Sequence, residues 1–159
     1  MRCCRLLVLL ALIAFAVPVS AYDGASLDRV QVIKSWLDTD GKTHEKVYDI
    51  AWSDDRKLGR DGKLPSVGNT VNVAEAAWTN AIGEPFLQAY WRDPDFYKTQ
   101  RAFYYVRVIE IPTPRWTTYD ARFFGTKIPK EAPTVIQGRA YTSPIWYTPY
   151  NGGFAHPRL

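Results

Sequence analysis

The chain has 159 residues, of which 47% are hydrophobic, 23% charged and 14% aromatic, and its formal net charge is +4. These proportions indicate one ordinary globular domain and exclude a disordered or low-complexity chain. The charge is small and no basic run occurs, so we expect no nucleic-acid partner. Both cysteines, Cys3 and Cys4, precede the domain, which excludes disulfides, thiolate zinc sites and cysteine nucleophiles from the rest of the chain.

The amino terminus has the three-part pattern of a secretion signal. Two arginines precede the unbroken apolar run Leu6–Val17, and small residues follow, with cleavage expected after Ala21. The twelve apolar residues span about 18 Å as a helix, short of the roughly 30 Å hydrocarbon core, so we expect no permanent membrane anchor. The alternative is a buried amino-terminal helix. We expect residues 1–21 to be a signal peptide, residues 22–159 to be a single β-rich domain, and the location to be periplasmic or extracellular.

The domain begins with a predicted β-hairpin. Ser26–Leu37 and Thr43–Trp52 are rich in β-branched and aromatic residues, as strands are. Gly41 lies in the connecting turn and is free to take a positive φ. In the second strand, three bulky side chains are expected on one face: Tyr48, Ile50 and Trp52.

The middle of the chain alternates between loop and extended patterns. Ser53–Gly68 places charged residues among glycines and is expected to form a long exposed loop, which in a compact domain is usually functional or poorly ordered. Asn69–Thr79 has extended character, and Pro85–Arg92 is expected to be a short strand. The Asp-Pro-Asp sequence at 93–95 stops that strand, because proline cannot donate to a ladder.

Arg101–Ile111 gives the strongest strand pattern, with apolar side chains on both faces, so we expect a central strand that is covered on both sides. Pro112–Pro114 is expected to end it. A short helix over Arg115–Phe124 would then be capped by Thr113 and Pro114 and closed by a glycine.

Thr134–Ile145 is the last extended run, and a tail begins near Asn151. Five or six strands with one or two short helices predict a mostly β fold. We expect an immunoglobulin- or fibronectin-like β-sandwich.

Few residues fit the patterns of catalytic, cofactor-binding or metal-binding sites. His44 and His156 have no second ligand at metal spacing and no obvious orienting partner for a serine triad. The carboxylates of the 53–68 loop are interleaved with basic residues, which favours a solvated loop over a calcium site. We therefore expect no catalytic, cofactor-binding or metal-binding residue.

Aromatic residues are abundant, with six tryptophans and ten tyrosines. Core packing is the default interpretation, and a sugar-stacking platform is the alternative. A group just past the central strand is the exception, since an arginine beside a tryptophan after a Pro-x-Pro bend suits an anion or a partner domain. This contact group is Arg115, Trp116, Tyr119 and Asp120. In the competing structural interpretation, Arg115 pairs with Asp120 and Trp116 covers the core edge.

Several segments resemble the carboxy-terminal region of a bacterial family known as domain of unknown function 3604. They are LDRVQVIKSWLDTDGKTHEKVYDIAWSDDR, DGKLPSVGNTV, WRDPDF, QRAFYYVRVIEIPTPRWTTYDA and RAYTSPIWYTP. The resemblance runs from about Leu27 to Pro149, and the aromatic run from Phe103 through Trp116 is its most specific part. Ser35 departs from the pattern, because the family often has glycine there.

The resemblance implies a part in a longer protein. The upstream part of longer members looks like a PHP-type metal-dependent phosphoesterase with a His-x-His element, and this sequence has no such element, so no metal ligand is carried over. We expect a secreted, non-catalytic accessory domain from a truncated gene, a split gene or a mis-called start. A PHP-like catalytic chain or domain is then the expected partner. The alternatives are half of a split PHP-type hydrolase and a carbohydrate-binding β-sandwich module, which an exposed flat row of aromatic residues would favour.

Overall fold

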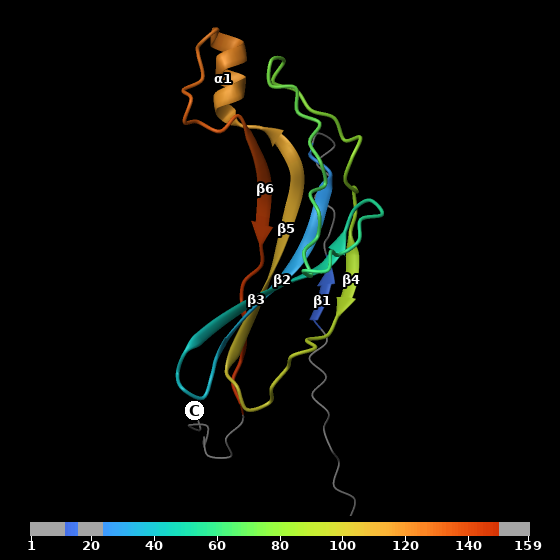
Figure 1. Cartoon of the computed structure of the whole chain (residues 1–159), viewed down its shortest axis with the longest axis vertical. Coiled ribbons are helices and arrows are strands. Elements are labelled where there is room, and N and C mark those ends of the chain that lie inside the picture. Colours follow the sequence, from blue (N-terminus) through green and yellow to red (C-terminus); the bar gives the residue numbers. More distant parts are fainter. Residues whose placement is uncertain (1–11, 16–23, 150–159) are drawn as a thin grey trace, which may run out of the picture.

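The structure is a computed structural model that describes residues 12–15 and 24–149 (Figure 1). Nearly all regular elements of the described residues are strands: β1 (Leu12–Phe15), β2 (Leu27–Leu37), β3 (Thr43–Trp52), β4 (Gln88–Trp91), β5 (Ala102–Pro114), β6 (Val135–Tyr141) and β7 (Ile145–Tyr147), with one helix, α1 (Trp116–Phe124). This confirms the mostly β class with a single short helix. The arrangement does not identify an immunoglobulin- or fibronectin-like sandwich.

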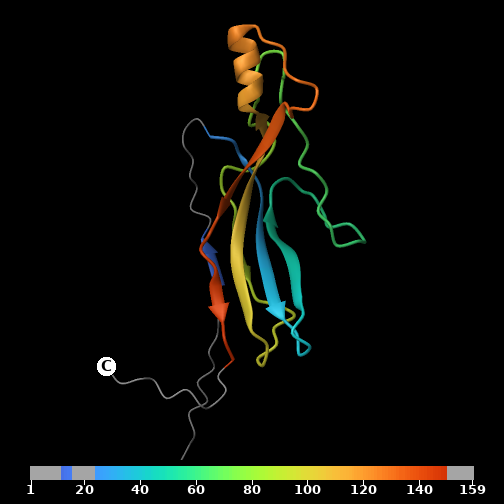
Figure 2. The same ribbon diagram turned by 90° about the vertical axis from the view of Figure 1, so that its left-hand side faces the viewer.

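One antiparallel sheet of five strands organises the domain. Its order is β3-β2-β5-β6, and β7 pairs with β5 beyond the end of β6, while β1 and β4 form a separate two-stranded sheet. The predicted hairpin of β2 and β3 is confirmed, and Gly41 in its turn has φ 77°. β5 has a partner strand along both edges, so its prediction as the central strand is also confirmed (Figures 1 and 2).

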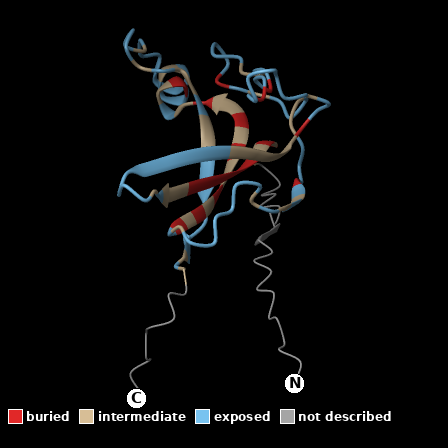
Figure 3. Ribbon diagram, turned by 60° about the horizontal axis from the view of Figure 1, so that its bottom comes forward, coloured by how far each residue is buried: buried red, intermediate tan, exposed pale blue. Residues whose placement is uncertain are grey.

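The main apolar cluster lies on one face of this sheet, which we call the covered face. Val30 and Val32 of β2 and Tyr104 and Val106 of β5 alternate along their strands and are buried together with Leu87, which precedes β4. Side chains at alternate positions point to the same side of a sheet, so these strands bury one continuous apolar layer. Figure 3 shows the buried residues as red bands along the central strands.

The opposite face is only partly covered. Ser35 lies directly opposite Phe103, and Phe103 lies opposite Trp146, so these three side chains share one face. Tyr105, two residues on, and Tyr141, opposite Arg107, share it too. Trp146 is 71% exposed and Tyr141 is 56% exposed. We call this the open face, although it is open only around Phe103, because Ile33 and Ile109 on the same face are 1% and 9% exposed. The expectation that β5 is covered on both sides is therefore right near Ile109 and wrong near Phe103.

A bulge changes the faces of β3. Val30 pairs with Ala51 and Gln31 pairs with Asp49, so Ile50 is an extra residue without an opposite partner. Alternation therefore shifts by one residue, and Trp52 lies on the same face as Asp49 instead of the face of Tyr48. The prediction that Trp52 shares a face with Tyr48 is wrong for this reason, whereas Ile50 still packs against the core of the covered face.

β5 continues through two prolines that were expected to end it. β2 stops at Leu27, opposite Glu110, and the Ile111 amide still donates to the Ser26 carbonyl at 2.9 Å, so from Pro112 on β5 is bordered by β6 alone. Proline is tolerated at such an edge because no ladder donor is needed on the free side. Consequently Pro114 belongs to β5 rather than to the helix cap. Arg115 is the N-cap residue, without a side-chain capping bond, and Gly125 ends α1 with φ 66°.

Two other extended segments differ from expectation. Asn69–Thr79 forms a turn closed by an isolated bridge between Asn72 and Ala77. The Asn72 side chain accepts hydrogen bonds from the amides of Ala74 and Glu75, which competes with strand pairing. The run Thr134–Ile145 is divided into β6 and β7.

The amino-terminal prediction falls mostly outside the described residues. Within the expected signal, β1 pairs antiparallel with β4, from Leu12 opposite Trp91 to Phe15 opposite Gln88. The signal peptide stays a prediction, and the tail from Asn151 also lies outside the described residues. No helix of the described residues is long and apolar enough to cross a membrane.

Candidate functional site

The predicted contact group lies at the start of α1, beyond the end of β5. The Arg115 amide donates to the Thr134 carbonyl at 2.9 Å, and the Arg115 carbonyl accepts from the amides of Thr118 and Tyr119. The Arg115 Nε atom is buried and has no hydrogen-bond partner among the described residues. Its guanidinium carbon lies 6.0 Å from the ring centre of Trp116. The backbone therefore fixes Arg115 while its side chain keeps an unused donor.

Trp116, Tyr119 and Asp120 are exposed. Among residues 24–149 no ion pair joins Arg115 to Asp120, which removes the predicted local pairing. Trp116 is 63% exposed, so it does not cover the core edge as the structural interpretation expected.

Two further aromatic residues belong to this surface and were missed from the sequence. Phe123 is 82% exposed and Phe124 is 69% exposed, at the last turn of α1. The adjacent pair just before Gly125 was the available signal. We call Trp116, Tyr119, Phe123 and Phe124 the aromatic end. It stands beyond the sheet at the top of Figure 1.

The histidine prediction needs one correction. His44 Nε2 lies 2.6 Å from Asp38 Oδ2, so His44 does have an orienting carboxylate. The hydrogen bond with His44, followed by that from the Lys42 amide, lowers the pKa of Asp38. The His44 ring also stacks on Trp36, 5.3 Å away. Because His44 is opposite Trp36 whereas Ser35 is opposite Glu45, the nearby serine lies on the other face of the sheet.

His156 lies outside the described residues. In the 53–68 loop, Asp54 accepts from the Ser53 hydroxyl, and Asp61 accepts from the Lys63 amide. Within the described part of the chain, no group of three His, Cys, Asp or Glu side chains is arranged to hold a metal ion.

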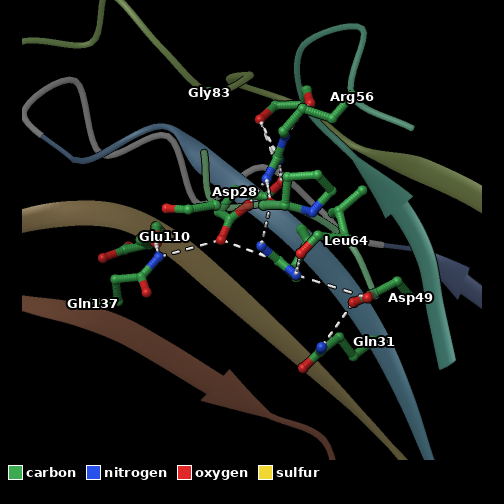
Figure 4. A network of polar contacts seen from close by, with 12 residues as sticks. Asp28, Gln31, Asp49, Arg56, Leu64, Gly83, Glu110 and Gln137 are labelled. Carbon is green, nitrogen blue, oxygen red and sulfur yellow. Dashed lines mark hydrogen bonds and ion pairs between the residues drawn. The ribbon is translucent and has the colours of Figure 1, made fainter. Parts of the chain in front are cut away.

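A buried polar cluster that sequence reasoning missed surrounds Asp28 (Figure 4). Asp28 Oδ2 accepts from Arg29 Nε at 3.1 Å and from Gln137 Nε2 at 3.2 Å. Its Oδ1 lies 2.8 Å from Arg56 Nη2 in an ion pair. Both arginines also donate to the Pro65 carbonyl, Arg56 at 2.9 Å and Arg29 at 3.2 Å. The cluster thus ties the long loop and β6 to β2.

This cluster also explains why the 53–68 loop is ordered without strands. The loop prediction is confirmed, but the loop is not exposed throughout, because Ser53, Leu64 and Val67 are buried. A buried charge is tolerated only when it is paired and hydrogen-bonded. Asp28 is ion-paired with two arginines, and its Oδ2 accepts from Arg29 and Gln137, whereas its buried Oδ1 accepts no hydrogen bond within the described residues. Its pairing makes it a clamp for the loop.

A second charged cluster lies lower on the covered face. Lys34 Nζ lies 2.7 Å from Asp93 Oδ2, and their side chains are only 3% and 7% exposed. Lys34 also donates to the Asp95 carbonyl at 2.6 Å, and the Tyr104 hydroxyl donates to Asp93 at 2.8 Å. Burial, and then the bond to Asp93, raises the pKa of Tyr104. The Asp-Pro-Asp segment after β4 is therefore fastened to the centre of the sheet.

The exposed margin of this cluster is also ionic. Asp95 accepts from Lys46 and from the Tyr48 hydroxyl. These two bonds, that from Lys46 first, lower the pKa of Asp95. Sequence reasoning identified the segment 93–95 only as a strand stop.

Together these features define a β-rich domain whose irregular segments are clamped to one antiparallel sheet by buried charges. The chain belongs to the family described as "Protein of unknown function (DUF3604)", which it matches over residues 12–149. The family resemblance is thereby confirmed, and the match begins upstream of the expected start at Leu27. No curated protein and no solved structure matches this chain.

Proposed function

We propose that this chain is a secreted, non-catalytic accessory domain of a metal-dependent phosphoesterase-like protein, and that it docks through the aromatic end. A PHP-like catalytic chain or domain is the partner and supplies the metal ligands. The observation that carries the proposal is the exposure of four aromatic side chains on one short helix: Trp116, Tyr119, Phe123 and Phe124.

An isolated helix of this length is marginal in water and usually gains its stability by burying one apolar side. α1 has nine residues, and only Thr118 is buried. Polar bonds to the segment before β6 hold it, from Thr118 Oγ1 to the Thr134 carbonyl at 2.6 Å and from Thr117 Oγ1 to the Pro133 carbonyl at 3.2 Å. The bulky side chains are left for another surface, and exposed clusters of this kind mark interfaces.

Arg115 supports the same proposal. A planar guanidinium held over a tryptophan ring is already oriented for a bidentate bond with a carboxylate. Its Nε donor is without a partner in the described residues. Because Nε itself is buried while the residue as a whole is half-buried, a carboxylate of the docking partner would pair with the terminal guanidinium nitrogens while the aromatic rings pack around it.

The proposal retains the sandwich interpretation in a limited form. Leu87 and Trp91 pack over the covered face as part of a second layer would. Export through cleavage after Ala21 remains part of the proposal. In that case β1 belongs to the segment that is removed.

The test is association with the upstream PHP-like part of a longer family member, measured by calorimetry. Replacing Phe123 and Phe124 together by alanine should weaken association at least tenfold without changing the melting temperature. Arg115→Lys keeps the charge but loses the planar fork, so it should weaken association less. Trp146→Ala, an exposed aromatic residue elsewhere, is the matched control. Absence of association, or equal loss with the control, would refute the docking proposal.

A further inference from the structure

A cross-strand row on the open face has an unusual composition. The register places Glu45 of β3, Ser35 of β2, Phe103 of β5 and Trp146 of β7 directly side by side. The small Ser35 side chain lies between an acid on one side and two large aromatic rings on the other. The small Ser35 side chain is therefore flanked by larger side chains on both sides, as at the bottom of a binding groove.

A hollow of about 580 Å³ lies at the end of the sheet beside the β2–β3 turn, lined by this row and also by covered-face residues such as Trp36, His44 and Tyr147. Small-molecule sites commonly enclose about 300–1,000 Å³. Phe103 and Trp146, with ring centres 4.9 Å apart, form its aromatic wall. Its polar lining includes Glu45 and Arg101, one charge of each sign, together with hydroxyl-bearing Ser35.

The aromatic surface continues along β5 beyond the hollow. Tyr105 lies 6.4 Å from Phe103 with nearly parallel rings, and Tyr141 lies 6.2 Å from Tyr105. Next to this line, Arg107 donates to Gln31 at 2.8 Å, and Gln31 donates to Asp49 at 2.7 Å. Aromatic and hydrogen-bonding side chains thus lie beside each other over several residues of strand.

We propose that the open face binds a neutral linear polysaccharide, with one sugar ring seated in the hollow against Trp146 and Phe103. The chain of sugars would continue along Tyr105 and Tyr141. Sugar rings have apolar C–H faces that pack on aromatic rings, and hydroxyls around their edges that pair with groups such as Glu45 and Arg101. The open face offers both kinds of contact in the same row.

The charge pattern selects this ligand class over an anionic one. A phosphate-rich ligand or an anionic membrane surface is met by an excess of basic side chains. Here Arg101 is balanced by Glu45, and Arg107 lies in one hydrogen-bonded line with Gln31 and Asp49. Arg139, opposite Ile109, adds one exposed arginine without an ion pair among the described residues, which is far short of a basic patch. A neutral polyol fits such a balanced surface.

This site is separate from the docking surface at α1. Figure 2 shows α1 and β7 at opposite ends of the molecule, so the two proposals can fail independently. Trp146 and Trp116 are the same residue type with similar exposure, 71% and 63%. They form a matched pair for the experiment.

The experiment is native electrophoresis of the full chain in gels containing hydroxyethylcellulose, galactomannan or arabinoxylan, with co-sedimentation on insoluble cellulose and chitin. At least one of these polysaccharides should retard or sediment the protein. Trp146→Ala should weaken that binding tenfold or more, and Ser35→Leu, which fills the hollow, should weaken it too. Trp116→Ala should bind as the unchanged chain does. Melting temperatures of the variants separate lost binding from unfolding.

Three results would overturn the proposal. The first is no binding to any of the five polysaccharides. The second is equal loss in Trp146→Ala and Trp116→Ala. The third is that Trp146→Ala instead abolishes binding to phosphatidylglycerol vesicles, or a dimer seen by size-exclusion chromatography, because the open face would then serve a membrane or a second copy.

Discussion

The two faces of the main sheet are built from the same strands but have different neighbours. On the covered face, Val32 and Tyr104 are sealed by the segment around β4, and the buried pair of Lys34 and Asp93 fastens the segment that follows. On the open face, no segment covers Phe103, whose neighbours are Ser35, Tyr105 and the exposed Trp146 of the same sheet. Apolar side chains alone therefore do not decide which face becomes core.

The difference between the two faces shows that the charged clusters attach irregular segments to the sheet. Two buried clusters, around Asp28 and around Lys34, attach segments without regular structure to the sheet. Each joins residues far apart in the chain, and each provides directional bonds that an apolar contact lacks. On the open face, the hydrogen-bonded line from Arg107 through Gln31 to Asp49 reaches the long loop only through Arg29, and nothing comparable attaches a segment over Phe103.

The largest loss of stability is expected when the buried ion pair of Lys34 and Asp93 on the covered face is broken. Lys34→Met leaves Asp93 buried with the Tyr104 hydroxyl and the Asp95 amide as donors but without a counter-charge, and losing one partner of such a pair costs about 3–5 kcal/mol. Denaturant unfolding measures this. Adding Asp93→Leu to Lys34→Met should recover part of the loss, because no unpaired charge then remains. A single variant as stable as the unchanged chain would show that the pair does not hold this segment.

The second effect concerns the centre of β5. Ile109 is 9% exposed and lies between Arg29 of β2 and Arg139 of β6. Ile109→Ala should destabilise by about 2–5 kcal/mol through lost burial and a cavity. Lys57→Ala, in the exposed part of the long loop, should change stability by less than about 0.5 kcal/mol. Equal shifts in melting temperature for the two variants would contradict this placement of the core.

The third effect concerns a carboxylate that has no ion-pair partner among residues 24–149. Partial burial raises the pKa of Glu110. Glu110 is therefore harder to ionise in the folded protein than in the unfolded chain. The stability that its neutral carboxyl group provides is fully present below the unfolded pKa of Glu110. This stability is lost as pH rises through the folded pKa. Glu110→Gln should therefore melt higher than the unchanged chain at pH 7, with the difference vanishing below about pH 4. A difference that does not vary with pH would rule out this origin.

The smallest stability effect is expected on the open face. Trp146→Ala removes a large side chain that is mostly in water, so the free energy of unfolding should change by no more than about 0.5 kcal/mol. The same substitution should abolish polysaccharide binding. Thermal unfolding with and without ligand measures both. Strong destabilisation would mean that the open face is part of the core after all.

The contact group shows which features of a surface site can be predicted from the sequence. Arg115 and Trp116 were placed correctly at the end of the longest strand, because the strand pattern and the Pro-x-Pro sequence are local signals. Phe123 and Phe124 were missed because their exposure depends on α1 having no element packed over it. The same limit applies to Asp28, whose partner Gln137 is 109 residues away in the chain.

Local sequence patterns were sufficient to place the β2–β3 hairpin and the central strand. β3 spans the predicted range Thr43–Trp52, and Gly41 and Gly125 take the positive φ that their turns require, since alternation and glycine conformations are set by neighbouring residues. Only the tertiary structure decided which face of the sheet is covered, where Ile50 bulges, and how far β5 runs past its first proline. These features depend on which distant segments meet across the sheet, and that choice follows from packing and ion pairing summed over the whole domain.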